Sequence, residues 1–549
     1  MLALALDGQA EVLESYLCRL VRSLRSPARR CSGSGAIAQR FGLDSLARLE
    51  LLVCCENALG VTLDPERFDS GITVRGFARS LASDLASVHR VGPSASIARA
   101  EPADPGDSPV PLSPAQLDYL RPGLPAPTGF VVDVFLRTPV DLDVAALETA
   151  LASIAARHDV FGFRFVSGHD GWRQIVDATH GRLAFHRLSA LGLDAEATRA
   201  LAKTQQAEVL AGMDLARGPL ARALLIERSP GQPGLLRLVI HHLIADETSV
   251  RILAVELDAA YRRACRGLPP LDEPSPNSFE RFTRSLAAAA GSPALDAEVG
   301  YWQDICRPYQ AVALACDGDS KGSANAPADV LGSLDDPTTA TLLRRFPDAR
   351  SRHGLLLAAS LQAWCRATQR TDAFVRLDHH GRQAVAGFPA PTSTVGYLVS
   401  YFPFRMEADS TWDAKRWLAE VRENLERVPG GGRGFGRLRY ASEYSSRKGS
   451  RDGARLGHAL ENPAMPQLSF SFRPRAEDTF RADMALPVVH ATSRVDEASS
   501  HARSAVDVQV LSGITDGQLH WTLRARPGLS CPEFLSKLSL GMGEFLSAL

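Results

Sequence analysis

The sequence HHLIADE, from His241 to Glu247, places two histidines a short distance ahead of two carboxylates. A neutral imidazole can accept and return a proton near physiological pH, so one histidine is a candidate general base. Such a base would activate an amine or hydroxyl, or remove an acidic proton beside a thioester. The alternative is a structural role, with one histidine packed, the other solvated, and Asp246 capping the following helix.

A metal site is the weaker interpretation of this stretch. Adjacent strand residues point to opposite faces, so His241 and His242 would not share one ion, and no third ligand is evident. The nine cysteines are scattered and include no CxxC pair. We therefore expect reduced cysteines in the core and no metal.

A second chemical element is Ser45, which stands in FGLDSLARLELL just before an amphipathic helical pattern. The backbone N–H groups at a helix N-terminus favour a phosphate group, so a hydroxyl there is a candidate attachment point. The alternative is that Ser45 or Asp44 only caps the helix.

The elements that would position Ser45 are helical. Apolar residues at helical spacing predict helices at 9–24, 46–59 and 72–86, hence a small all-α bundle over 1–85. Residues 86–110 are rich in Pro, Ala, Ser and Asp without apolar periodicity, which predicts a flexible linker.

The elements that would position His242 alternate between strand and helix. We expect a helix at 140–159, strands at 221–229 and 234–240, and a helix at 248–263. His241, His242 and Asp246 then fall in a connection between strand and helix, where sites are common.

Length and composition limit the possible functions. A chain of 549 residues needs at least two structural units, and 45% hydrophobic with 22% charged residues is ordinary for a globular protein. The net charge of -1 gives no reason to expect nucleic acid or an anionic membrane as partner. The N-terminus lacks the pattern of a secretory signal and no stretch is apolar enough to span a bilayer, so we expect a cytoplasmic protein.

The helical unit with GLDSL, LGVTL and a T-V-x-x-F-A helix resembles an acyl or peptidyl carrier domain. The resemblance implies that Ser45 carries a covalent 4′-phosphopantetheine arm, attached by a phosphopantetheinyl transferase. The thiol of that arm would hold a thioester substrate.

Residues 111–549 resemble the condensation-domain superfamily of nonribosomal peptide synthetases, which includes epimerization domains. HHLIADE looks like the family's HHxxxDG motif. Further segments follow in the family's order: PLSPAQLDYL, ARHDVFGFRF, MDLARGPLARA, RLDHHGRQ, STVGYLVSYFPF and VPGGGRGFGRLRY. The last lacks a GK[ST] ending, so we expect an inter-lobe loop and not a phosphate loop.

This resemblance implies a two-lobed α/β (α+β) fold like chloramphenicol acetyltransferase, with lobes at 111–275 and 276–549 and a tunnel between them. It assigns His242 as the base and gives His241 and Asp246 the role of holding the motif's shape. It also implies an arginine partner for Asp246, with Arg382 and Arg164 as the candidates.

Two reactions remain open on the same resemblance. In acyl transfer, His242 would help an amine or alcohol attack the thioester. In epimerization, it would exchange the α-proton of an aminoacyl group together with a second acid, for which Asp378 takes the place of the family's glutamate. TSVRIL and the GGGRGFGRLRY segment resemble epimerization domains, whereas GLDSL, the shorter Asp378 and the altered late motif FSFRP favour acyl transfer.

Glu247 replaces the glycine of the HHxxxDG motif. It would raise the pKa of a nearby imidazole, assist proton transfer, bind a cationic substrate, block a route, or simply face solvent in the first helical turn. The change also keeps a third hypothesis open, a catalytically silent domain that only presents the carrier.

No adenylation, ketosynthase or thioesterase region fits in the sequence. We therefore expect an upstream synthetase or adenylating enzyme to load the carrier. The acceptor would be a small molecule or a group on a partner carrier protein.

Overall fold

The computed structural model describes residues 109–549 with internal gaps, and seven residues before them. The gaps are at 121–128, 170, 178–182, most of 194–207, 271–272, 276, 291, 315–328, 383–384, 386–390, 446–459, 461–463, 474–483, 495–505, 516, 527–528 and 530. The earlier described residues are Glu14, Leu17, Thr73 and 76–79. The predicted all-α bundle at 1–85, Ser45 and the linker at 86–110 therefore lie almost entirely outside the described residues.

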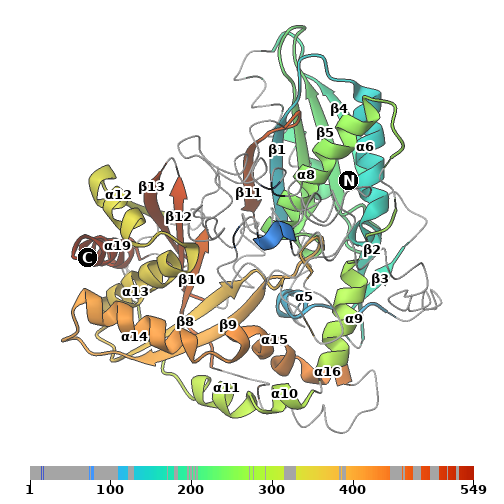
Figure 1. Ribbon diagram of the computed structural model, residues 1–549. Helices are drawn as coiled ribbons and strands as arrows, with labels where there is room; N and C mark the ends of the chain where they lie inside the picture. The colour runs from blue at the N-terminus through green and yellow to red at the C-terminus, as the bar shows by residue number, and fades with distance from the viewer. Residues whose placement is uncertain are drawn as a thin grey trace.

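The described chain forms two α/β lobes, each built on its own sheet (Figure 1). The N-lobe sheet has the order β11-β1-β6-β5-β4. Its strands are β1 (Val131–Arg137), β4 (Ala184–Ser189), β5 (Ala221–Glu227), β6 (Leu235–His241) and β11 (Val488–Arg494).

Two long helices cover this sheet. They are α6 (Val144–Arg157) and α8 (Glu247–Ala264), which pack against each other (Figure 1). Both lie where the sequence predicts helices, and each begins at an aspartate whose carboxylate accepts a backbone N–H, Asp143 for α6 and Asp246 for α8. The two predicted strands at 221–229 and 234–240 are also confirmed as β5 and β6, which pair in an antiparallel ladder.

Smaller elements complete the N-lobe and its boundary. They are α5 (Pro114–Tyr119), η2 (Asp159–Gly162), the hairpin β2 (Phe163–Gly168) and β3 (Gly171–Val176), η3 (His242–Ile244), and α9 (Phe279–Ala289).

The C-lobe sheet has the order β7-β13-β12-β10-β8-β9. Its strands are β7 (Asp329–Ser333), β8 (Asp372–His379), β9 (Ser400–Glu407), β10 (Leu468–Arg473), β12 (Val508–Thr515) and β13 (Gln518–Ala525). On β8, Val375 and Leu377 belong to the C-lobe core. Because side chains alternate along a strand, Arg376 and Asp378 lie on the other face of the sheet.

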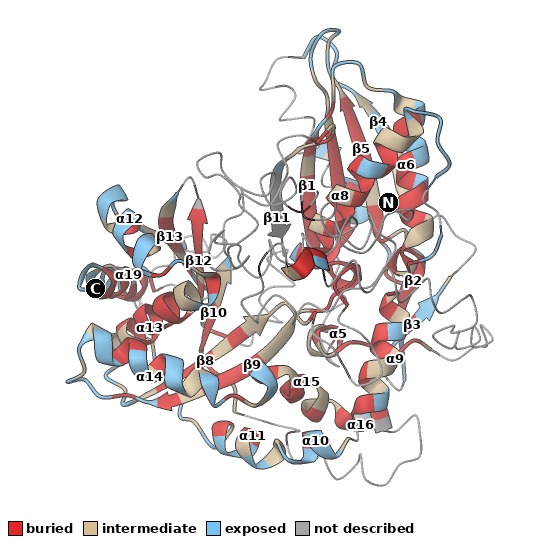
Figure 2. Cartoon of the chain, in the orientation of Figure 1, coloured by how far each residue is buried: buried red, intermediate tan, exposed pale blue. Residues whose placement is uncertain are grey.

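Helices pack on the core face of the C-lobe sheet, where α13 contacts α14, α19 and β8 (Figures 1 and 2). The middle of α13 is fully buried, which explains its almost uninterrupted run of Leu and Ala. The helices of this lobe are α10 (Pro293–Asp296), α11 (Val299–Ile305), α12 (Asp336–Arg345), α13 (Ala349–Thr368), α14 (Ala414–Glu426), η4 (Pro429–Gly432), α15 (Arg433–Arg439), α16 (Ala441–Ser445) and α19 (Pro532–Ser547).

The two lobes do not divide at one point in the sequence. Strand β11 comes from the C-terminal half of the chain but pairs with β1 in the N-lobe sheet. The N-lobe core also contains Phe279, Tyr397 and Leu486. Segments from after residue 275 therefore contribute directly to the N-lobe.

The described residues bear on three expectations, which concern the burial of cysteines, membrane-spanning helices and metal ligands. Of the described cysteines, Cys365 and Cys531 are buried thiols as expected, but Cys265 is exposed, so its assignment to the core is wrong. None of the described helices is long and apolar enough to cross a bilayer. No group of three or more metal-ligating side chains is assembled in the part of the chain that the structure describes.

Candidate active site

His241 and His242 occupy different kinds of backbone. His241 is the last residue of β6, and His242 begins the 3₁₀ turn η3 that leads to α8. The His241 ring is fully buried and its Nδ1 accepts a hydrogen bond from the N–H of Leu243 at 3.2 Å. His241 therefore helps to shape the turn that presents His242.

The His242 ring is held between aromatic side chains. It stacks on Phe130 with ring centroids 4.1 Å apart and planes 5° from parallel, and Tyr397 meets it edge-on at 4.9 Å. Tyr119 stacks on the other face of Phe130 at 4.2 Å. The backbone is also anchored, because the N–H of His242 donates to the carbonyl of Phe130 at 2.8 Å. These contacts fix the ring orientation.

Burial isolates the His242 ring and sets its protonation state. Its side chain is 7% exposed, and Nδ1 makes no hydrogen bond with any described residue. Burial lowers the pKa of His242, an effect that the carboxylates of Asp246 and Glu247 partly oppose and Arg473 reinforces. The imidazole is therefore neutral at physiological pH, as a general base must be.

Asp246 is paired with Arg382, one of the two arginines that the sequence suggests. The guanidinium donates two hydrogen bonds to the carboxylate, at 2.7 and 2.8 Å, and both side chains are buried. The backbone N–H groups of Ser249 and Leu398 also donate to it. Burial alone would raise the pKa of Asp246, but the charge of Arg382 and these hydrogen bonds hold it below its usual value.

The second candidate, Arg164, has a different role and does not pair with Asp246. It donates to the backbone carbonyls of Phe163 and Arg217 at 2.7 and 2.9 Å. Both arginines are buried, and only the tertiary structure decides which one reaches the carboxylate.

A tight turn after β8 positions Arg382 beside Asp246. Gly381 has a φ of +69°, and a Cβ at this position would lie 1.7 Å from the carbonyl oxygen of Leu398. The turn is closed by Nδ1 of His380, which accepts from the backbone N–H of Arg382 at 3.0 Å. A glycine is therefore required where the RLDHHGRQ segment passes closest to the 393–404 segment.

Glu247 does not simply face solvent. Its carboxylate forms an ion pair with Arg473, the last residue of β10, at 2.7 Å. Glu247 opens α8 in the N-lobe, whereas Arg473 belongs to the C-lobe sheet. The two side chains are 47% and 46% exposed, so the pair joins the lobes at an accessible position.

Asp378 lies near the end of β8 in a polar environment shared with this ion pair. Its Oδ1 is 3.8 Å from Nε of Arg376 and has no hydrogen-bond partner among the described residues. Burial raises the pKa of Asp378 to about 6, with Glu247 adding to the effect, while Arg376, Arg473 and a hydrogen bond with Ser471 oppose it. Asp378 is therefore an acid that can exchange a proton near neutral pH.

A pair of tyrosines connects the surroundings of Asp378 with those of His242. Tyr401 lies opposite Asp378 in the β8–β9 ladder, and its hydroxyl is 2.8 Å from that of Tyr397. Tyr397 in turn contacts the His242 ring. The guanidinium of Arg376 stacks over the Tyr401 ring at 4.7 Å. His242 and Asp378 thus face one polar and aromatic region from opposite lobes.

The segment at 428–440 is helical where a loop is expected. It forms η4 and α15. The glycines lie at the entry to the helix, where Gly430 and Gly431 of η4 have positive φ, and so a helix can follow them. Its placement between the lobes is nevertheless confirmed. Arg439 and Tyr440 contact Asp118 of α5 at 3.2 and 2.9 Å.

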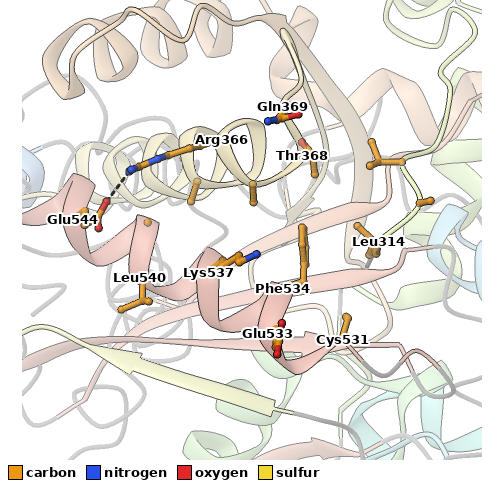
Figure 3. A pocket seen from close by; sticks show the side chains of 15 residues that line it. Leu314, Arg366, Thr368, Gln369, Cys531, Glu533, Phe534, Lys537, Leu540 and Glu544 are labelled. Carbon is orange, nitrogen blue, oxygen red and sulfur yellow. Dashed lines mark hydrogen bonds and ion pairs between the residues drawn. The ribbon is translucent and has the colours of Figure 1, made fainter. Parts of the chain in front are cut away.

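A separate pocket of about 600 Å³ lies on the C-lobe between α13, α19 and residues 312–314 (Figure 3). Arg366 and Glu544 form an ion pair of 2.6 Å at its rim. None of the candidate residues at 241–247 or Asp378 lines it. The pocket is therefore no part of the site around His242.

Sequence reasoning missed four side chains of this site. Phe130, Tyr397, Tyr401 and Arg473 either contact His242 or act on Asp378. Three of them stand in motifs that the sequence singles out, STVGYLVSYFPF and FSFRP, but nothing in one sequence marks an aromatic or basic residue as facing a site. The pairing of β8 with β9 and β10 is what places Tyr401 and Arg473 on the side of Asp378.

Comparisons with known proteins match both parts of the chain. A family model described as a condensation domain matches residues 107–453, and one described as a phosphopantetheine attachment site matches residues 22–81, which include Ser45. The second match implies a covalent 4′-phosphopantetheine on a serine of that region.

The curated relatives are components of peptide synthetases. One of the linear gramicidin synthase proteins of Brevibacillus parabrevis is 28% identical over 79% of this chain and 5% of its own length. One of the plipastatin synthase proteins of Bacillus subtilis (strain 168) is 25% identical over 76% of this chain and 16% of its own length. The chain thus spans a small part of the relatives that it matches.

Solved structures confirm the two-lobed α/β fold. The epimerization domain from the third module of tyrocidine synthetase B aligns with a TM-score of 0.64 at 21% identity, over 80% of this chain and 96% of that one. The condensation domain of Monacolin K polyketide synthase aligns with a TM-score of 0.59 at 15% identity, over 80% and 97%. With its family match over more than half of its length, this chain belongs to the condensation-domain family and carries a phosphopantetheine attachment region ahead of that domain.

Proposed function

We propose that this chain takes part in nonribosomal peptide or polyketide biosynthesis by transferring an acyl or aminoacyl group from its own carrier to an amine or alcohol. His242 is the general base, and the product is an amide or an ester. The observation that carries this proposal is the state of His242, a buried, neutral imidazole with a free Nδ1, held rigidly between Phe130 and Tyr397.

The residues around His242 fit a carrier-borne thioester, because its unpartnered ring nitrogen, held against the aromatic ring of Phe130, can take a proton. The loaded arm on Ser45 supplies an electrophilic carbonyl carbon. His242 removes a proton from the attacking nitrogen or oxygen and returns it to the departing sulfur. Asp246, held by Arg382, and His241 are positioning residues that fix the turn.

The proposal requires partners for loading and release. A phosphopantetheinyl transferase attaches the arm to Ser45, and an upstream synthetase or adenylating enzyme supplies the acyl group. The acceptor is a small molecule or a group on a partner carrier protein. We place this reaction in the cytoplasm and assign residues 1–85 to the carrier and 86–110 to the linker. The predicted lobes at 111–275 and 276–549 are divided near residue 275 in the sequence, but β11 and other segments after that residue belong to the N-lobe.

A second candidate is epimerization of a carrier-bound aminoacyl group, with His242 and Asp378 exchanging the α-proton from opposite sides. One observation favours it. Asp378 is an acid with a pKa of about 6 that faces the His242 region from the other lobe, and acyl transfer does not require it.

One experiment separates the candidates. The carrier is loaded from acetyl-, hexanoyl- or alanyl-coenzyme A, incubated in deuterated water with amines and alcohols, and followed by intact-protein mass spectrometry beside His242→Ala. Loss of the acyl group to an acceptor that depends on His242 supports transfer. Gain of one deuterium on the alanyl group that depends on His242 and Asp378 supports epimerization. If His242→Ala alters neither the acyl transfer nor the deuterium uptake, the result supports the third hypothesis, a catalytically silent domain that only presents the carrier.

A further inference from the structure

The ion pair between Glu247 and Arg473 is exposed enough to be opened by a ligand. The carboxylate and guanidinium are 2.7 Å apart, and about half of each side chain is in contact with solvent. Exposed ion pairs of this kind contribute little to stability. A ligand that brings one charge of each sign would replace both contacts at little cost.

The pair also lies beside the groups that do chemistry. Glu247 follows Asp246 directly at the start of α8, and both members of the pair act on the pKa values of His242 and Asp378. Arg473 is two residues beyond Ser471, which contacts Asp378, so their side chains share one face of β10. A ligand between Glu247 and Arg473 would therefore lie within electrostatic reach of His242, whose buried Nδ1 has no hydrogen-bond partner among the described residues.

We propose that Glu247 and Arg473 bind the acceptor, and that the acceptor is a free amino acid. Arg473 takes its carboxylate in a bidentate contact, and Glu247 takes its ammonium group and places it beside His242. This inference rests on the proposed acyl transfer and specifies its acceptor. An acceptor held on another carrier as a thioester has no free carboxylate, so the site discriminates against it.

The reaction balances with the groups in place. The bond between the acceptor nitrogen and the acyl carbon forms, and the bond between that carbon and the carrier sulfur breaks. The ammonium group loses two protons. His242 returns one to the sulfur as a thiol, and the other is released to water through Glu247, which is half exposed.

The test compares acceptors that differ only in the carboxylate. The acylated full-length protein is offered an equimolar mixture of the twenty proteinogenic L-amino acids, or the matching mixture of amino acid amides, and products are quantified by mass spectrometry. The best amino acid and its amide are then compared by kcat/KM. We expect a preference for the acid of about tenfold or more, because a hydrogen-bonded charge contact is lost with the amide.

Variants of the Glu247–Arg473 ion pair test whether it causes the preference for the acid over the amide. Arg473→Gln should reduce the ratio of kcat/KM for acid and amide to near one, chiefly through KM for the acid. Glu247→Gln should raise KM for both acceptors. Arg187→Gln, which breaks the Arg187–Glu227 pair between β4 and β5, is the matched control and should keep the full preference.

Equal use of acid and amide, or a preference that survives Arg473→Gln, overturns the inference while the proposed transfer stands. If neither mixture is acylated, the inference fails, and the acylated protein is then offered an aminoacyl group on a carrier protein. Absence of transfer to that acceptor as well defeats the proposed function.

Discussion

Arg382 and Asp246, 136 residues apart in the sequence, form a bidentate ion pair in which both side chains are almost completely buried. The pair ties the turn after β8 to the first residue before α8, and so connects the C-lobe to the turn that carries His242. Removing one member of such a pair leaves an uncompensated buried charge, which is far more costly than losing an exposed pair.

We therefore expect Arg382→Ala to lower the free energy of unfolding by about 3–5 kcal/mol, measured by urea denaturation followed by circular dichroism. Arg284→Ala, which removes an exposed ion pair with Glu280 on α9, is the control and should change stability by less than about 0.5 kcal/mol. Similar effects in the two variants would mean that the buried pair contributes no more than a surface pair.

His242→Ala should reduce the reaction of the carrier-bound group by about 10²–10⁴-fold, the usual contribution of a general base. The comparison is with His186→Ala, a histidine exposed on β4, which should keep full activity. Single-turnover release of the acyl group, followed by intact-protein mass spectrometry, measures both. Full activity in His242→Ala would exclude this residue as the base.

The pH dependence should reflect the buried state of His242. Because burial lowers its pKa, the neutral base persists below the ordinary histidine value of about 6.5, and the rate should stay on its plateau there. Glu247 raises the pKa of His242 and Arg473 lowers it. Glu247→Gln should therefore move the acidic limb to lower pH, and Arg473→Gln should move it to higher pH. Shifts in the same direction would contradict the electrostatic account.

Asp378 should affect stability in a pH-dependent way. Its pKa is raised from 3.8 to about 6 in the folded state, so folding favours the protonated form. The associated stability is fully present below pH 3.8 and is lost as the pH rises through 6. Asp378→Asn should thus raise the free energy of unfolding at pH 7.5 by roughly 3 kcal/mol and change it little at pH 4. Urea denaturation at the two pH values measures this, and an equal effect at both would rule out the raised pKa as its cause.

Ser45→Ala should prevent attachment of the phosphopantetheine arm. Incubation with coenzyme A and a phosphopantetheinyl transferase should increase the mass of the wild-type protein and of Ser34→Ala by one arm, and leave Ser45→Ala unchanged. Modification of Ser45→Ala would place the attachment at another serine of the region 22–81.

The sequence by itself determined the local elements and the identity of the motifs. Helix α8 follows from its apolar spacing and from Asp246, whose short carboxylate satisfies the first N–H groups of the helix. Strands β5 and β6 follow from two β-like runs joined by a turn. These features depend on neighbours in the chain, so one sequence is enough to read them.

Only the tertiary structure decided which distant side chains meet. Arg382 and Arg164 are equally suitable partners for Asp246 in the sequence, and the choice depends on Gly381 and on the close approach of Leu398. Glu247 is exposed in the first turn of α8, as one alternative predicts, but its ion pair with Arg473, 226 positions later, arises only because β10 pairs with β8 and ends beside α8. Contacts of this kind arise from strand order and lobe packing, which no local pattern of residues encodes.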